Sequence, residues 1–375
     1  MRQQVTLQLS NGDVFHGGLI GAPMKASGEL VFTTAMVAYS ESLTDPSYFG
    51  QILVFTYPLI GNYGVPTMPK SFDVRTTVGF ESNKVHASAV IVASDSTEAF
   101  HWTSRQSLHH WLKDQGVPGI VGIDTRHLVH LIRESKNLLA KVIPATEGER
   151  RLLGSLDTFP EEGFFDPSDH QIIKEVSSSE RKVFGKGNCR IGLLDCGVKW
   201  NILRQLIELG CEVELLPYDT DLQNVDCSAW LISNGPGNPQ QTGGVVDEVK
   251  KIYEGERPIL GICLGHQIMC LAAGFKTERM AFGHRSHNQP VYLLGSKKAY
   301  ITSQNHGYMV KDEDRPDSWE VWFRNVNDDS IEGIRHKSKP FRSVQFHPES
   351  AGGPRDTAWV LHQFVAEVKR HAKQA

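Results

Sequence analysis

From Arg190 onward the chain alternates short apolar segments with helix-forming segments, and this rhythm limits the folds that are open to it. In the first helix-forming segment Ile202, Leu203 and Leu206 fall on one face, as does Ile207, which is what burial against a sheet requires. Strands and helices that alternate with short links form an α/β fold, a doubly wound and mostly parallel sheet with helices on both faces. Ligands of such sheets bind beyond the carboxyl ends of the strands, so functional residues are expected there. The expected elements are strands at 191–195, 213–216, 230–233 and 258–262 and helices at 199–209 and 245–253.

Residues 1–153 follow a different pattern, in which short strands and turns dominate. An alternating apolar stretch from Val5 to Leu9 ends at Asn11-Gly12, a strong β-hairpin signal. Two helical stretches interrupt the strands, so we expect a smaller mixed α+β domain. Residues 154–189 are rich in Pro, Asp, Ser and Glu, which predicts a linker. The predicted organisation is an N-terminal domain at 1–153, a linker at 154–189 and the α/β domain at 190–375.

The composition of the chain, together with its apolar runs and cysteines, argues against several classes of function. Its 375 residues carry 39 basic and 43 acidic side chains, so no basic stripe is available for nucleic acid. The longest apolar runs, such as 89–93, are far shorter than the roughly 20 residues of a membrane-spanning helix. No secretory or transit peptide fits the N-terminus, and the six cysteines form no CxxC pair. We therefore expect no membrane, no disulfide framework and a reducing, cytoplasmic location.

A candidate nucleophile stands at the end of the strand predicted at 258–262. The sequence GICLGHQ at 261–267 places a single thiol, Cys263, between small residues and in front of an apolar helix-forming run. This is the arrangement of a nucleophile elbow, in which glycines permit the tight turn. The positive end of the following helix would stabilise a thiolate. Taken alone, a cysteine beside a strand is more often a buried structural residue, which is how we interpret Cys270.

A thiol nucleophile needs a general base and a group that orients this base. Near the C-terminus the sequence QFHPE at 345–349 follows a predicted strand. Residues i and i+2 of an extended segment project to the same side, so Glu349 can reach the ring of His347. An exposed histidine beside a glutamate is common by itself. Together with the elbow at Cys263, the pair predicts a proton carrier and its orienting carboxylate.

The loop that follows the strand at 230–233 supplies a third element. Its sequence, SNGPGNP at 233–239, could be only a turn. At this end of the sheet, however, the backbone amide of Gly235 could face that of Leu264 and form an oxyanion hole.

Other candidate sites in the sequence are supported more weakly. His127 and His130, like His284 and His287, have H-x-x-H spacing without a third acidic or thiol ligand nearby, so we expect no metal site. No ATP-binding loop is recognisable. Three aromatic residues are interpreted as core or interface rather than as a ligand stack: Phe100, Trp102 and Trp111.

The motifs at 261–267, 233–237 and 345–349 together resemble those of the triad-type, class I glutamine amidotransferases, which hydrolyse glutamine to glutamate and ammonia. Motifs outside the triad look like the small, glutaminase part of carbamoyl-phosphate synthetase. The resemblance covers both domains. In detail the sequence looks most similar to the eukaryotic pyrimidine-pathway type, in which this unit is often fused to the synthetase. These motifs are FTTAM (32–36), LTDPSY (43–48), YPLIGNYG (57–64), GIDTR (122–126), DCGVK (195–199), HNQP (287–290) and TSQNHG (302–307).

The resemblance implies that Cys263 is the nucleophile, His347 the acid/base and Glu349 its orienting partner, acting through a glutamyl-thioester. It implies L-glutamine as substrate and a carbamoyl-phosphate synthetase large subunit or fused synthetase domain as partner. No cofactor is expected in this chain, because the synthetase uses ATP, Mg²⁺ and bicarbonate. The first domain would dock the synthetase and close the glutamine site. The residues implied in glutamine binding are Ser47, Gly235, Gly237, Leu264, Gln267, Asn305, Gly307 and Tyr308.

Some positions depart from the family pattern without removing a reacting group. Ser286 stands where glycine is common, Tyr308 where phenylalanine is usual, and Ala35 and Ala38 replace glycines. One alternative is a triad amidotransferase that serves anthranilate, GMP or CTP synthesis, which the N-terminal motifs oppose. Another is a non-hydrolytic regulatory or docking module of the same fold. The pyrimidine and arginine pathways both stay open.

Overall fold

The computed structural model describes residues 2–96, 98–145, 148–313 and 315–373. The chain forms two compact units, Met1–His170 (unit 1) and Gln171–Ala375 (unit 2). The boundary between the units falls inside the segment 154–189, which the sequence suggested as a linker. Parts of this segment therefore belong to each unit.

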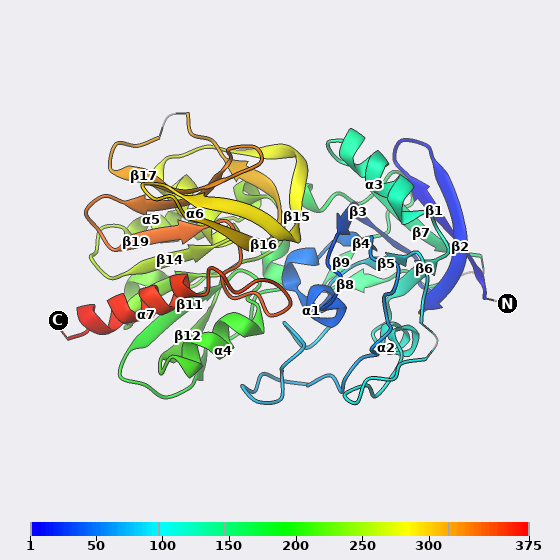
Figure 1. Ribbon diagram of the computed structural model, residues 1–375, viewed down its shortest axis with the longest axis horizontal. Coiled ribbons are helices and arrows are strands. Elements are labelled where there is room, and N and C mark those ends of the chain that lie inside the picture. The colour runs from blue at the N-terminus through cyan, green and yellow to red at the C-terminus, as the bar shows by residue number, and fades with distance from the viewer. Residues whose placement is uncertain (1, 97, 146–147, 314, 374–375) are drawn as a thin grey trace. The chain divides into compact units, whose positions relative to one another are not determined.

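Unit 1 is built around a closed barrel in the order β1-β2-β6-β5-β4-β3-β7 (Figure 1). The strands β3, β4, β5 and β6 run parallel, and the other neighbouring pairs run antiparallel. Pairing of β1 with β7 leaves no open edge, and apolar side chains from the barrel strands fill a common core. The expected mixed α+β content is confirmed, whereas barrel closure was not predicted. The bounds are β1 (Gln4–Leu9), β2 (Val14–Gly21), β3 (Ala26–Thr33), α1 (Tyr39–Thr44), β4 (Gln51–Phe55), β5 (Ala89–Val92), α2 (Leu108–Asp114), β6 (Pro118–Val121), α3 (Thr125–Glu134), β7 (Leu139–Pro144), β8 (Leu152–Leu153) and β9 (Leu156–Asp157).

Unit 2 contains a ten-stranded sheet in the order β10-β12-β11-β13-β14-β19-β18-β16-β15-β17 within the described residues. The five strands from β12 to β19 in this order are parallel, as predicted, and antiparallel strands extend the sheet on both sides. The bounds are β10 (Lys182–Phe184), β11 (Arg190–Asp195), β12 (Glu212–Pro217), β13 (Ala229–Ile232), β14 (Ile259–Ile262), β15 (Thr277–Leu293), β16 (Ala299–Val310), β17 (Trp319–Asn325), β18 (Ile331–His336) and β19 (Phe341–Val344).

Helices cover both faces of this sheet (Figure 1). The helices α5 (Val245–Ile252) and α6 (Leu264–Ala273) pack together on one face, and α4 (Trp200–Glu208) contacts α7 (Trp359–His371) on the other. The α5 and α6 face shares one apolar core with Leu194, Leu216 and Ile232 of the parallel strands. None of the described helices is both long enough and apolar enough to cross a membrane.

The parallel strands position the predicted functional residues. Because β11, β13, β14 and β19 are mutually parallel neighbours, their carboxyl ends lie along one edge of the sheet. The loops that follow these strands begin at Cys196, Ser233, Cys263 and Gln345. All three motifs that suggested chemistry therefore converge on one edge.

Ala38, one of the departures from the family pattern, has a left-handed backbone conformation, with φ 67° and ψ 38°. This conformation costs an L-residue about 1–2 kcal/mol, and glycine avoids most of that cost. We expect Ala38→Gly to raise the free energy of unfolding by about 0.5–1 kcal/mol, since the greater entropy of glycine in the unfolded chain offsets part of the gain. Urea denaturation measures this change.

The matched control is Ala35→Gly, because Ala35 is also buried and is not among the described residues with positive φ. It should lower the free energy of unfolding instead. Equal effects of the two substitutions would contradict the argument from backbone conformation.

Candidate active site

Cys263 occupies a strained turn between β14 and α6. Its φ of 53° and ψ of −104° are unusual for a residue with a side chain. A Cβ atom at Gly261 would lie 2.6 Å from the Gly265 carbonyl oxygen, and one at Gly265 would lie 2.1 Å from the Ile232 carbonyl oxygen. Both flanking positions therefore require glycine, so the tight turn predicted at Cys263 is present, while the role of Cys263 as a nucleophile stays a prediction.

The sulfur of Cys263 lies in a polar environment although the residue is only 3% exposed. Its Sγ is 3.8 Å from the Asn305 carbonyl oxygen and 3.7 Å from Nε2 of Gln345. Leu264 is the first residue of α6, so its amide N–H has no acceptor within the helix. The N-terminal end of the helix favours negative charge on the adjacent sulfur.

His347 and Glu349 form the predicted pair directly beyond β19. Nδ1 of His347 lies 2.7 Å from Oε1 of Glu349, and both side chains are buried. Since the carboxylate can only accept, Nδ1–H donates to it, and Nε2 is left for proton transfer. Nε2 makes no hydrogen bond to another described residue. The i, i+2 spacing of the two side chains is confirmed.

The surroundings of this pair favour its charged form. Burial and Lys199 each lower the pKa of His347, but Glu349 and Cys263 outweigh them and raise it to about 10. Burial raises the pKa of Glu349, but His347 and Lys199 outweigh this effect and lower it to about 2. At neutral pH the histidine is therefore an imidazolium beside a carboxylate.

Lys199 is a site residue to which the sequence analysis assigned no role. Its Nζ lies 3.1 Å from Nδ1 of His347 and 3.2 Å from Oε1 of Glu349, and the side chain is buried. Lys199 belongs to the motif DCGVK, which follows β11. Its place after a parallel strand was the signal that could have identified it.

If the site hydrolyses glutamine, as the resemblance implies, we expect Lys199→Met to shift the alkaline limb of the pH profile of kcat for that reaction to higher pH. Lys199 lowers the pKa of His347, so without it the imidazolium keeps its proton to higher pH. A more tightly held proton makes a poorer acid, so kcat at neutral pH should fall about tenfold. Lys199→Arg, which keeps the charge, is the matched control. A limb that stays in place or moves to lower pH in Lys199→Met would contradict this role.

The loop after β13 packs against the start of α6. A Cβ atom at Gly235 would lie 2.0 Å from the Cys196 carbonyl oxygen and 2.9 Å from Cδ2 of Leu264. The structure therefore brings Gly235 and Leu264 together, as the oxyanion-hole hypothesis requires, although that role stays a prediction. Gly237 follows in a left-handed conformation, with φ 91°.

The remaining predicted glutamine-binding residues of unit 2 lie on α6 and β16. Nε2 of Gln267 donates to the Tyr308 carbonyl at 2.9 Å, and Nη1 of Arg285 donates to Oδ1 of Asn305 at 2.9 Å. Gly307 lies between Asn305 and Tyr308 on β16. Because Tyr308 acts here through its carbonyl, the change from phenylalanine leaves this contact unaltered.

Ser47 belongs to unit 1. It lies in a short 3₁₀ helix, Pro46–Tyr48, where its backbone N–H donates to Oδ1 of Asp45 at 2.9 Å. Its part in glutamine binding stays a prediction.

One group of described residues has the spacing of metal ligands, namely His284, His306 and Glu332. His284 lies 3.2 Å from Glu332 and 3.0 Å from Asp328. Burial lowers the pKa of His284, but its hydrogen bonds to Asp328 and Glu332 outweigh this effect and raise it to about 9. The group is thus linked by its own ion pairs. Neither H-x-x-H pair predicted it, because its members come from three different strands.

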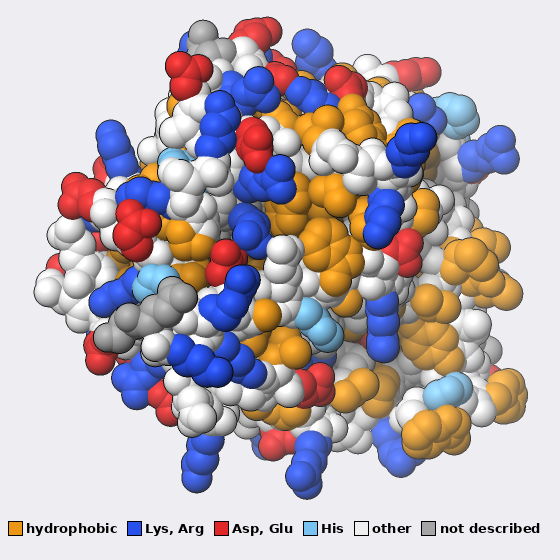
Figure 2. All heavy atoms as spheres, turned by 60° about the vertical axis from the view of Figure 1, so that its left-hand side comes forward, with side chains coloured by type: hydrophobic (Ala, Val, Ile, Leu, Met, Phe, Trp, Pro, Cys, Tyr) orange, Lys and Arg blue, Asp and Glu red, His pale blue; other side chains and the backbone are white. Residues whose placement is uncertain are grey.

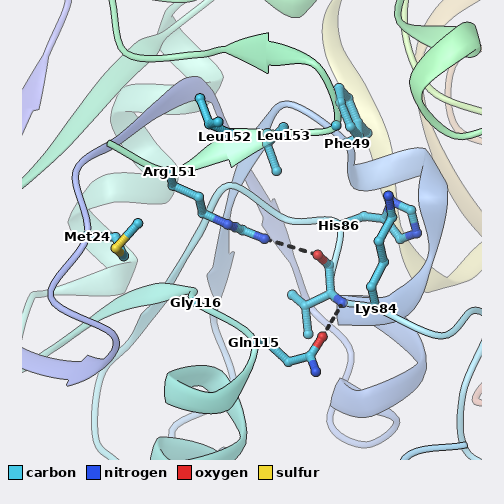
Figure 3. A pocket seen from close by; sticks show the side chains of 11 residues that line it. Met24, Phe49, Lys84, His86, Gln115, Gly116, Arg151, Leu152 and Leu153 are labelled. Atoms are coloured by element: carbon cyan, nitrogen blue, oxygen red, sulfur yellow. Dashed lines mark hydrogen bonds between the residues drawn. The ribbon is translucent and has the colours of Figure 1, made fainter. Parts of the chain in front are cut away.

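Unit 1 contains a cavity of about 270 Å³, in which Arg151 is the buried cation (Figure 3). Arg151 donates to the Val85 carbonyl at 3.0 Å, and the Val85 amide donates to Oε1 of Gln115 at 3.2 Å. Burial lowers the pKa of Arg151 to about 9. None of the predicted site residues lines this cavity.

Charged and apolar side chains are interspersed on the face shown in Figure 2. Of the three aromatic residues interpreted as core or interface, Trp111 is buried, whereas Phe100 and Trp102 are 86% and 82% exposed. Unit 1 therefore carries two large aromatic side chains exposed on its surface.

Residues 192–367 match the family described as "Glutamine amidotransferase class-I". Unit 2 is thus a class I glutamine amidotransferase domain, which agrees with its elbow, its parallel sheet and its His347–Glu349 pair. Residues 7–142 match the "Carbamoyl-phosphate synthase small chain, CPSase domain". The chain belongs to the carbamoyl-phosphate synthase small-chain family, the glutamine-hydrolysing component of that enzyme.

Curated relatives match nearly the full chain. The arginine-specific carbamoyl phosphate synthase small chains of Emericella nidulans and Schizosaccharomyces pombe are each 41% identical over 98% of this chain, which covers 80% and 88% of their lengths. The multifunctional protein CAD of Squalus acanthias is 45% identical over 96% of this chain. The chain spans 16% of the length of that protein.

Proposed function

We propose that Cys263, His347 and Glu349 hydrolyse glutamine and that the ammonia released passes to a carbamoyl-phosphate synthetase. The observation that carries this proposal is the convergence of a strained thiol elbow and a buried 2.7 Å histidine–carboxylate pair at one edge of a parallel sheet. This is the geometry that acyl transfer by a thiol requires.

The reaction begins when the Cys263 thiolate attacks the side-chain amide carbon of glutamine. The oxyanion of the tetrahedral intermediate accepts hydrogen bonds from the backbone N–H groups of Leu264 and Gly235. The imidazolium of His347 gives its Nε2 proton to the departing nitrogen, so ammonia leaves and a glutamyl-thioester remains. Neutral His347 then removes a proton from water, whose attack releases glutamate and regenerates the thiolate. Glu349 holds the ring in one orientation and stabilises its charge.

Glutamine is held by the residues that the family resemblance names. In unit 2 these are backbone and side-chain groups of Gly237, Gln267, Asn305, Gly307 and Tyr308. Ser47 of unit 1 is also among the residues that the resemblance implies in glutamine binding.

The partner is a synthetase large subunit or a fused synthetase domain. ATP, Mg²⁺ and bicarbonate are used by that partner, and this chain needs no cofactor for acyl transfer by a thiol. The exposed aromatic side chains Phe100 and Trp102 support docking through unit 1. The names of the arginine-specific relatives support a role in arginine synthesis. The resemblance of the sequence motifs to the pyrimidine-pathway type supports a role in pyrimidine synthesis. Six free cysteines fit a cytoplasmic location.

Ser47→Ala tests the role of the first domain. With the synthetase present, we expect the KM for glutamine to rise about tenfold with little change in kcat, the effect of losing one hydrogen bond to a charged substrate group. Ser94→Ala is the control, because Oγ of Ser94 donates to the Pro58 carbonyl at 2.6 Å and has no proposed role in the site. An unchanged KM for Ser47→Ala would remove Ser47 from the glutamine site.

A further inference from the structure

A chain of side-chain amides leads from β16 to the sulfur of Cys263. Nε2 of Gln267 donates to the Tyr308 carbonyl at 2.9 Å and to Oε1 of Gln345 at 3.0 Å. Nε2 of Gln345 in turn lies 3.7 Å from Sγ of Cys263. Gln345 is fully buried and Gln267 is 3% exposed.

The carbonyl oxygen of Tyr308 fixes the donor-to-acceptor direction of these hydrogen bonds. A carbonyl can only accept, so the group of Gln267 that faces Tyr308 must be its NH₂. The second hydrogen of the same NH₂ points to Gln345, whose oxygen must therefore face Gln267. The NH₂ of Gln345 is consequently the group that faces the sulfur. His306 also contacts the Tyr308 carbonyl, at 2.9 Å from Nδ1, and helps to hold it in place.

The sequence QFH explains why Gln345 reaches this position. Gln345 and His347 project to the same side of the extended segment after β19. Phe346 projects to the other side and packs edge-on against Phe323, with ring centroids 5.2 Å apart. The Cys263 amide donates to the Val344 carbonyl at 2.9 Å, so the elbow and this segment are held in register.

The polarity at the sulfur favours the thiolate. A neutral thiol can donate to the Asn305 carbonyl, 3.8 Å away. Once the proton has left, the sulfur can only accept, and the N–H of Gln345 already points at it. Buried N–H donors directed at a developing charge stabilise it strongly, because their orientation costs nothing during the reaction.

We infer that Gln345 is a further catalytic residue, which donates an N–H to the Cys263 thiolate. Through its Oε1 it also fixes the Gln267 amide, so that Oε1 of Gln267 is the end available to accept a hydrogen bond from substrate. This inference deepens the proposed glutaminase function and rests on it.

Two substitutions separate the two roles of Gln345. Gln345→Glu has the same shape and keeps an oxygen for Gln267, but its carboxylate cannot donate to the sulfur and adds negative charge. Gln345→Met fills a similar volume and removes both contacts. Gln240→Met is the control, because Gln240 lies in the short 3₁₀ helix Pro239–Gln241, is exposed and has no proposed role in the site. Thermal unfolding and near-UV circular dichroism establish which variants fold.

The first readout is the pH dependence of Cys263 alkylation by iodoacetamide in the full chain without glutamine. The pH of half-maximal alkylation should rise by at least about one unit in both variants, because the thiolate loses a donor, and Gln345→Met shows this effect without the added negative charge of Gln345→Glu. Gln240→Met should match the wild type. An unchanged midpoint in folded Gln345→Glu would overturn the inference, and this result does not depend on whether the chain hydrolyses glutamine.

The second readout is the division of the kinetic effect between kcat and KM. We expect kcat to fall about 100-fold in both variants, as for the loss of one oxyanion donor. The KM for glutamine should change little in Gln345→Glu and rise about tenfold in Gln345→Met, where Gln267 loses its partner. Equal increases in KM with an unchanged kcat would show that Gln345 only supports substrate binding. If Gln345→Met does not fold, the alkylation midpoint and kcat of Gln345→Glu still decide the question.

Discussion

Cys263→Ala is expected to abolish glutamine-dependent carbamoyl phosphate synthesis and to leave synthesis from added ammonia intact when the synthetase is present. The thiolate is the proposed nucleophile for the amide carbon, whereas free ammonia bypasses that step. Both activities are measured on the same preparation with the synthetase partner. The loss of glutamine use should reach the background of the assay, since removing a covalent nucleophile costs several orders of magnitude.

Cys270→Ala is the matched control for this experiment. Cys270 is buried on the same helix, and burial raises its pKa well above the usual value for a thiol. It should keep glutamine-dependent synthesis and lose only stability. If Cys263→Ala lost ammonia-dependent synthesis as well while remaining folded, Cys263 would serve the partner interface and not the chemistry.

His347→Asn is expected to reduce glutamine turnover by about 10³-fold or more, because it removes the proton carrier. Glu349→Gln should cost less, about 10²-fold, since it weakens the orientation and the charge stabilisation of the ring but leaves the imidazole. Glu349 raises the pKa of His347, so its neutralisation should lower that pKa and move the alkaline limb of kcat to lower pH. This shift is opposite in sign to the one expected for Lys199→Met.

The ranking of these variants tests the assignment. His127→Asn, in α3 of unit 1, is the control histidine and should retain turnover. A loss at His127 equal to that at His347, or an unchanged rate in His347→Asn, would contradict the proposed role of the pair.

Local sequence was sufficient to predict the residues that define the elbow and the pair. The glycines around Cys263 report a steric requirement of the turn itself, since a Cβ at Gly265 would lie 2.1 Å from the Ile232 carbonyl oxygen. Likewise, the i, i+2 relation of His347 and Glu349 is a property of an extended segment. The parallel orientation of β11, β12, β13 and β14 follows from their alternation with helices. In contrast, β19 follows the antiparallel strand β18 without an intervening helix, so its parallel pairing with β14 was not predictable in this way.

Features that depend on distant pairing were not predictable in this way. The pairing of β1 with β7 closes the barrel of unit 1, but the local pattern of each strand is the same in an open sheet. The contact of Lys199 with His347 joins residues 148 positions apart. The hydrogen bond between Gln267 and Gln345 spans 78 positions, and its direction follows only from the Tyr308 carbonyl at its far end.

Selective trapping of Cys263 by a glutamine-analogue electrophile tests the central claim most directly. The full chain is incubated with the reagent, with and without excess glutamine, and the labelled residue is identified by peptide mass spectrometry. We predict one label per chain, at Cys263, which glutamine prevents and which His347→Asn slows. Absence of this label, or a label that glutamine does not prevent and that spreads over the cysteines, would contradict the account and favour a docking module that does not hydrolyse glutamine.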